Sequence, residues 1–225
     1  MTLELQLLLL AWGTLVGIDL VSVPQMMIAR PLVAGAVAGA MLGDLPTGLL
    51  LGVVFELFQL DILPVGAVRY PEYGPATIAA VSAAHAAPGL LGLGLGTMVG
   101  LVTALVGGLS LHLLRRLNAH AVHRAAARIE AGDAEALFRT HLGGIVRDAF
   151  RAAGVTAIGL GLAWVGRVVL AGALSAPGVT VLAVAAAAGA LAAGAGGTFR
   201  LIGRGPALRW FAVGLGGSAL VAWLR

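Results

Sequence analysis

Charged and amide side chains interrupt apolar stretches in the first half of the chain, where an ionised group is costly unless it meets a partner or a polar cavity. The run LLLGVVFELFQL carries Glu56, with Gln59 one helical turn later on the same face. A carboxylate and an amide at this spacing can hydrogen-bond the hydroxyl groups of a polar ligand. The alternative is a structural ion pair between Glu56 and Arg30 or Arg69.

A second group of polar residues follows in LPVGAVRYPEYGPATIA, residues 63–79. Pro64, Pro71 and Pro75 oppose a regular helix from 64 to 75, and Gly66 and Gly74 permit unusual backbone angles. Non-helical backbone at membrane depth must be buried in protein or line a watery cavity. We therefore expect this loop to bring Arg69 and Glu72 over a ligand held beside Glu56. An exposed loop at the membrane interface is the alternative.

The other acids of this half have structural explanations. In MLGDLPTG, Gly43 can end one helix and Asp44 can cap the next, which has a proline in its first turn. Asp19 precedes a step at which Pro24 and Pro31 interrupt the helical pattern. For Asp19, a cavity lining and a simple kink at the membrane interface both remain open.

Phosphoryl, nucleophilic and metal chemistry are not predicted for this chain. It has no cysteine, and its five histidines follow no ligand spacing. It also lacks a glycine-rich phosphate loop and an HExxH metal motif. The sequence therefore predicts no catalytic residue, no metal and no cofactor, and it favours binding and translocation.

The elements that position these residues are predicted to be membrane helices. Hydrophobic residues make up 60% of the 225 residues, charged residues only 11%, and the mean hydropathy is +1.00. A soluble domain carries about 25% charged residues. All 14 basic residues are arginines, which indicates compositional bias rather than a nucleic-acid surface. We expect an all-α, polytopic integral membrane protein.

Segment lengths divide this single membrane domain, residues 1–225, into two unequal halves. A straight span needs about 20 apolar residues. Residues 1–114 contain the short apolar pieces 31–43 and 75–87, and between them the piece 45–65, which holds Glu56 and Asp61. These pieces predict broken or re-entrant helices around the substrate site. Full spans are predicted at 89–114, and in residues 152–225 at 154–175, 177–198 and 207–224.

Residues 115–151 separate the halves and carry seven of the 14 arginines. The excess of arginine between apolar spans predicts a cytoplasmic location. Leu117, Ala121, Ala125 and Ile129 recur at steps of four, which suits a helix lying on the membrane surface. A solvated helical hairpin is the alternative.

Two glycine series predict close helix packing: Gly35, Gly39 and Gly43, and then Gly92, Gly96 and Gly100. We expect these faces to need partner helices, and the chain to form a homo-oligomer. Lipid-facing glycine is the alternative.

Residues 30–80 resemble the IIC subunit of mannose-type sugar phosphotransferase systems, the mannose/fructose/sorbose family of bacterial permeases. The similarity includes the Arg-Pro-Leu step, the Gly-Asp turn, the Leu-Glu helix and the Val-Gly-Ala loop. Matching positions are Arg30, Pro31, Gly43, Asp44, Gly48, Glu56, Gly66 and Pro71, and Glu72 stands where an aspartate is usual. Residues 26–29 and Pro64 replace polar residues of the family pattern.

The resemblance implies a sugar permease subunit in the bacterial cell membrane, working with a IID membrane subunit and with IIA and IIB phosphocarriers. Predicted substrate contacts are Glu56, Gln59, Gly66, Arg69 and Glu72; Arg30, Pro31, Asp44 and Pro71 are predicted to be structural. One alternative is a secondary transporter with Glu56 as a proton or cation site. Another is a degenerate IIC-like scaffold.

Overall fold

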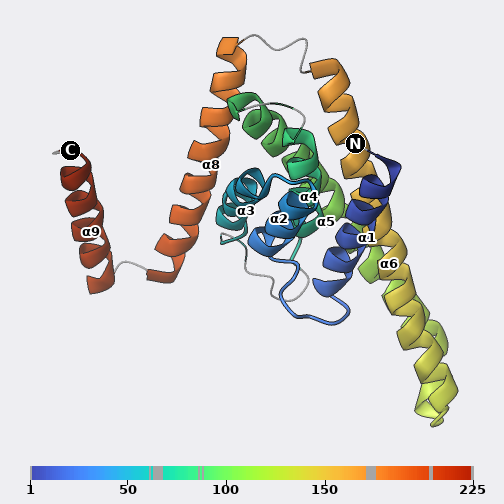
Figure 1. Cartoon of the computed structure of the whole chain (residues 1–225). Helices are drawn as coiled ribbons and strands as arrows, with labels where there is room; N and C mark the ends of the chain where they lie inside the picture. Colours follow the sequence, from blue (N-terminus) through green and yellow to red (C-terminus); the bar gives the residue numbers. More distant parts are fainter. Residues whose placement is uncertain are drawn as a thin grey trace.

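The computed structural model describes residues 2–60, 62, 68–85, 87, 89–170, 176–202 and 205–223, and all regular elements in these ranges are helices. They are α1 (Leu3–Asp19), α2 (Pro31–Met41), α3 (Leu45–Leu60), α4 (Tyr73–Ala84), α5 (Gly89–Glu130), α6 (Ala134–Val165), the π-helical turn η1 (Gly166–Leu170), α8 (Ala176–Ile202) and α9 (Pro206–Trp223). Figure 1 shows α1 to α4 gathered beside α5 and α6. The predicted all-α membrane fold is confirmed.

Helix length differs between the first four helices and the later ones. Among the described residues, three segments are long and apolar enough to cross a membrane: Gly89–Glu130, Ala134–Val169 and Thr180–Gly197. By contrast, α2 has 11 residues and α4 has 12. A 12-residue helix rises about 18 Å, which is less than the hydrocarbon core of about 30 Å. Helices α1 to α4 are thus too short to span alone.

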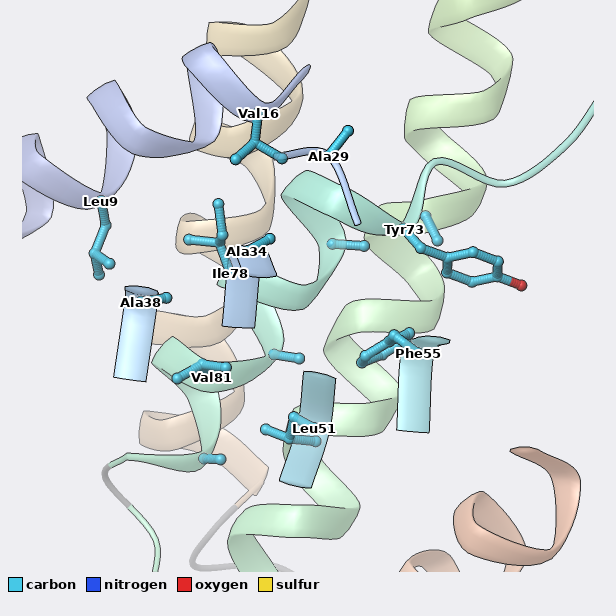
Figure 2. Close-up of a cluster of buried hydrophobic side chains, with 14 of the residues drawn as sticks. Leu9, Val16, Ala29, Ala34, Ala38, Leu51, Phe55, Tyr73, Ile78 and Val81 are labelled. Atoms are coloured by element: carbon cyan, nitrogen blue, oxygen red, sulfur yellow. The ribbon is translucent and has the colours of Figure 1, made fainter. Parts of the chain in front are cut away.

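Helix α4 lies at the centre of the bundle, and every one of its residues is buried. It packs against α5, α6, α2, α3 and α1. Most of its side chains are small, so five helices can approach its backbone. Figure 2 shows Ile78 and Val81 of α4 among core side chains from α1, α2 and α3. The buried Thr77 hydroxyl is satisfied locally, since it donates to the Tyr73 carbonyl at 2.7 Å.

The first glycine series joins α2 to α3, which confirms close packing. A methyl group on Gly39 would lie 2.7 Å from the Asp44 carbonyl oxygen and 2.8 Å from Gly48 Cα. Gly43 does not pack; its φ of +72° ends α2. The Asp44 carboxylate accepts the Thr47 N–H at 3.2 Å and caps α3, as predicted.

The second glycine series packs α5 on α4. A methyl group on Gly96 would lie 2.7 Å from the Ala80 carbonyl oxygen. A methyl group on Gly92 would lie 2.3 Å from the Ala87 carbonyl oxygen and 2.8 Å from that of Ala84. One on Gly100 would lie 2.2 Å from the Phe55 ring of α3 and 3.0 Å from Ala80 Cβ. Both series are therefore covered by helices of this chain. The expectation that these faces need partner helices loses its basis, because the partners are intramolecular.

Two segments differ from the expected outline. Helix α4 begins at Tyr73, so Pro75 lies in its first turn, where its missing N–H would have no intrahelical partner anyway. Residues 115–151 form the ends of α5 and α6, joined by a turn at Gly132 with φ +84°. Asp133 caps α6 by accepting the Ala136 N–H at 2.9 Å. This is the hairpin alternative, and Figure 1 shows it projecting beyond the bundle.

Candidate functional site

A small polar cavity lies where the turn after α1, the end of α3 and the start of α4 meet. Its volume is about 100 Å³, and it is lined by Leu20, Ala29, Arg30, Gln59, Ile62, Tyr70, Pro71, Tyr73 and Gly74. An open hollow of about 320 Å³ shares four of these residues and adds Asp19, Gln25 and Met27. The two spaces together offer two amides, a guanidinium, a carboxylate and two phenols beside apolar side chains, a composition that suits a polar ligand.

Arg30 and Glu56 form an ion pair beside this cavity. The Glu56 carboxylate also accepts the Leu32 N–H at 3.2 Å, in the first turn of α2. That turn begins with Pro31, and Arg30 provides no side-chain cap, so Glu56 caps α2 from the neighbouring helix. Glu56 thus holds the Arg30 side chain at the cavity wall. Of Glu56 and Gln59, the two residues predicted to contact a ligand together, Gln59 lines both the cavity and the open hollow.

Asp19 shapes the turn that forms one wall. Its buried carboxylate accepts the Met26 N–H at 2.6 Å and the Ala29 N–H at 3.0 Å. Gln25 and Met27 adopt φ of 60° and 64°, values unusual for residues with a side chain. Asp19 therefore fixes a constrained turn, and it also lines the open hollow.

Glu72 does not line the cavity; it is fully buried against α6. Its two carboxylate oxygens accept from Arg151, Nη1 to Oε2 at 2.5 Å and Nη2 to Oε1 at 3.0 Å. Arg151 Nε donates to Asp148 at 2.7 Å, and its remaining N–H groups reach Ser110 Oγ at 3.2 Å and the Gly17 carbonyl at 3.1 Å. All five guanidinium donors therefore have acceptors.

Two glycines make room for this buried charge cluster. A methyl group on Gly107 would lie 2.7 Å from Glu72 Cβ and Oε2, and one on Gly17 would lie 3.4 Å from Glu72 Oε1. The Glu72 N–H donates to the Ala104 carbonyl at 2.9 Å, which ties the backbone before α4 to α5. The segment around Glu72 thus packs closely against α5 at Gly107.

The Arg151 cluster connects both walls of the cavity. Glu72 lies between Pro71 and Tyr73, which line it. Ser22, which lies in the turn after α1 that also provides Leu20 and Ala29 to the cavity lining, donates a hydrogen bond to the Asp148 carboxylate. One buried guanidinium on α6 therefore holds two separate wall segments.

Sequence reasoning missed Arg151 because it lies at the end of the arginine-rich segment. Two signals in the sequence point to it. Asp148 and Arg151 are three apart where the apolar part of α6 begins, and residues 1–114 have six acids against two arginines. Buried acids in such excess need a basic partner from elsewhere in the chain.

Most of the remaining predicted residues do not line the cavity. Arg69 is exposed, and its Nη2 lies 3.5 Å from His112 Nε2 on α5, away from Glu72. Gly66 lies outside the described residues. Pro71 lines the cavity, and Pro31 begins α2. Among the described residues, no three His, Asp or Glu side chains gather closely enough to hold a metal ion.

A larger hollow of about 470 Å³ lies between α1 and α6, lined by Leu3, Gln6, Leu7, Leu10, Ser82, Ala157, Leu160, Gly161, Trp164 and Arg167. Its lining is dominated by leucine and other apolar residues, and Leu3 and Leu7 are 70% and 55% exposed. Such an open apolar wall suits lipid contact better than a polar ligand. The smaller cavity is therefore the candidate site.

Comparison with known families gives one match over almost the whole chain. The family model described as the PTS system sorbose-specific IIC component matches residues 5–222. The fructose permease IIC component of Bacillus subtilis (strain 168) is 31% identical over 122 residues, 54% of this chain and 45% of that protein. The sorbose-specific EIIC component of Klebsiella pneumoniae is 35% identical over 111 residues, 49% and 40%.

The mannose-specific EIIC component of Escherichia coli (strain K12) is 27% identical over 124 residues, 55% of this chain and 46% of that protein. The chain thus spans about half the length of the curated relatives it matches.

Two solved structures share the fold. One, described as the structure of a membrane protein, has a TM-score of 0.77 at 20% identity and covers 99% of this chain and 91% of its own. The other is a cryo-EM structure of the mannose transporter ManYZ with microcin E492. Its TM-score is 0.57 at 18% identity, with coverage of 97% and 87%.

Proposed function

The chain belongs to the family of sorbose-specific IIC components of the phosphotransferase system (PTS), multi-pass proteins of the bacterial membrane, and we propose that its polar cavity binds a sugar for translocation. The observation that carries this proposal is the meeting of Arg30, Gln59 and Tyr70 at one cavity inside a membrane bundle. Sugars present many hydroxyl groups, which guanidinium, amide and phenol groups can hydrogen-bond.

The predicted site residues divide into two proposed roles. We propose that Gln59 contacts the sugar directly, together with Arg30, which Glu56 orients. Glu72 does not contact the sugar but stabilises the cavity wall, because its ion pair with Arg151 fixes the backbone on either side of Glu72. Arg69 and Gly66 remain predicted substrate contacts from the segment before Tyr70, although Arg69 is not among the residues that line the cavity.

We further propose that the substrate is a hexose. The relatives are named for fructose, sorbose and mannose, three sugars with similar hydroxyl patterns. The apolar residues Met26 and Met27 lie in the constrained turn beside the hollow, where they remove potential hydroxyl contacts. Discrimination among hexoses then depends on few polar groups.

The proposed partners follow from the family. The solved structure of the mannose transporter ManYZ shares the fold of this chain. We propose that this chain works beside a IID membrane subunit, and that IIA and IIB carriers supply the phosphoryl group. The chain itself contributes binding and passage.

Uptake of radiolabelled hexoses tests this function in cells that express the chain with its partner subunits. We expect accumulation that depends on phosphoenolpyruvate and stops when a IIB active site is inactivated. Uptake that persists without phosphoenolpyruvate, and instead follows a proton or cation gradient, would favour secondary transport. A Gln59→Leu variant should reduce uptake while its membrane level stays normal.

A further inference from the structure

A groove runs along the outer face of α5. It shares Tyr70 and Pro71 with the cavity, but its lining is mostly apolar. It has a volume of about 340 Å³ and is lined by Arg69, Tyr70, Pro71, Leu105, Gly108 and Leu109. The leucines are 59% and 69% exposed, so the groove opens outward. Gly108 lets the segment before α4 lie close to α5, since a methyl group there would be 3.2 Å from Pro71 Cα.

One end of this groove is strongly basic. Arg115 donates to the Val68 carbonyl at 3.0 Å and to the Tyr70 hydroxyl at 3.3 Å, with its guanidinium 5.4 Å from the Tyr70 ring centroid. Arg69 lies beside His112. Within the described ranges, the ion pairs formed involve none of Arg69, Arg115 and Arg116. The positive charge of this end is therefore not neutralised there by a carboxylate.

The change from apolar to basic follows a single helix face. Leu105, Leu109, His112 and Arg116 are separated by steps of four, three and four residues. Eleven residues of helix rise about 16 Å, close to half of the hydrocarbon core of about 30 Å. The groove is thus about as long as one leaflet of the bilayer is thick. Its apolar side chains lie at the level of the acyl chains, and its arginines lie at the level of the headgroups.

We propose that this groove binds an anionic phospholipid. One acyl chain lies along Leu105 and Leu109 beside Pro71, and the phosphate meets Arg69 and Arg116. Arg115 is held in place by Tyr70 and strengthens the positive field. A zwitterionic lipid offers the same tail without net charge, and a soluble phosphate offers the charge without the tail, so the groove selects for both together.

Native mass spectrometry of the purified, delipidated full-length chain tests this site, with phosphatidylglycerol and phosphatidylcholine as probes. We expect preferential retention of phosphatidylglycerol. Arg69→Gln and Arg116→Gln should each weaken it roughly fivefold, the effect of one arginine near an anionic headgroup. Arg124→Gln, an equally exposed arginine two turns further along α5, is the matched control and should have little effect.

Equal retention of the two lipids would overturn the proposal. So would binding of glycerol 3-phosphate as tight as that of phosphatidylglycerol, which would assign the basic end to a soluble phosphate or a phosphorylated protein. A loss in Arg124→Gln equal to that in Arg116→Gln would reduce the effect to diffuse surface charge. Unchanged thermal unfolding establishes that each variant is folded, and Arg116, which is exposed, decides the result if Arg69→Gln unfolds.

Discussion

At the scale of single residues, a buried arginine organises the most polar part of the bundle. The Arg151 and Glu72 side chains are 7% and 0% exposed, yet each charged group has partners. Burying ions costs several kcal/mol each, and this is recovered only with good geometry and satisfied donors. The five acceptor atoms around Arg151, three of which belong to the Glu72 and Asp148 carboxylates, meet this condition.

Replacement of Arg151 by Met should destabilise the protein strongly. It leaves the Glu72 and Asp148 carboxylates buried without a cation, a loss of about 3–5 kcal/mol in the free energy of unfolding. Thermal unfolding in detergent measures this change. Arg139→Met is the control, because Arg139 is 74% exposed and pairs with Glu135 at the hairpin surface.

Neutralising the acids should recover part of this loss. A variant that combines Arg151→Met with Glu72→Gln and Asp148→Asn contains no unpaired buried charge. If the triple variant is no more stable than Arg151→Met, the cluster does not act through charge compensation.

Local pairings at this scale were partly predictable from the sequence. The Asp44 cap follows from a short-range sequence pattern. The sequence also offers an ion pair of Glu56 with Arg30 or Arg69 as the alternative to a ligand contact, and Glu56 pairs with Arg30. The Glu72–Arg151 pair joins residues 79 positions apart, and no local pattern encodes such a contact. Its prediction required knowing that α6 packs beside α1 and α4.

At the scale of helices, small residues let short elements form a dense core. Helices α2 and α3 approach through Gly35, Gly39 and Gly48, and α4 contributes mainly alanine. Close backbone approach increases dispersion contacts, which drive helix association where lipid is as apolar as leucine. These contacts hold α3, and with it Gln59, at the cavity.

Replacement of Gly39 by Ala should weaken the α2–α3 pair. The added methyl meets Gly48 Cα and the Asp44 carbonyl oxygen, neither of which can rotate away. Overpacking of this kind costs about 1–3 kcal/mol. Gly154→Ala is the matched control, since a methyl group there has no atom within 4 Å. Equal unfolding midpoints for the two variants would show that the α2–α3 contact is loose.

Element type and length were predictable, but several boundaries were not. Apolar run lengths distinguished the short helices from the spans because bilayer thickness sets a minimum length. Pro75 suggested a loop, yet the first turn of α4 accepts it. The periodicity of 115–151 suited a surface helix and a hairpin equally, and tertiary packing of α5 with α6 decided between them.

At the scale of the whole molecule, the hairpin of α5 and α6 extends the bundle at its arginine-rich end (Figure 1). Residues 115–151 carry seven arginines and four acids, Glu130, Asp133, Glu135 and Asp148. By the positive-inside rule we expect this end in the cytoplasm, where soluble phosphocarriers are found.

Insertion of a reporter at Gly132 tests this orientation. Gly132 lies in the turn at the hairpin tip, with open space around it, so an insertion there should leave both helices intact. A fluorescent protein should be bright, and alkaline phosphatase at the same position inactive. Active phosphatase would place the hairpin outside the cytoplasm and would reverse the proposed topology.

The central claim is that the polar cavity at Arg30 and Gln59 is the sugar site. Equilibrium binding of a labelled hexose to membranes containing the chain and its partner subunits tests it most directly, with Gln59→Leu compared with Gln6→Leu in the larger hollow. Loss of one buried hydrogen-bonding group costs about 1–3 kcal/mol, so affinity should fall roughly 5- to 150-fold for Gln59→Leu and stay unchanged for Gln6→Leu. Unchanged affinity for Gln59→Leu, or a selective loss for Gln6→Leu, would contradict the account.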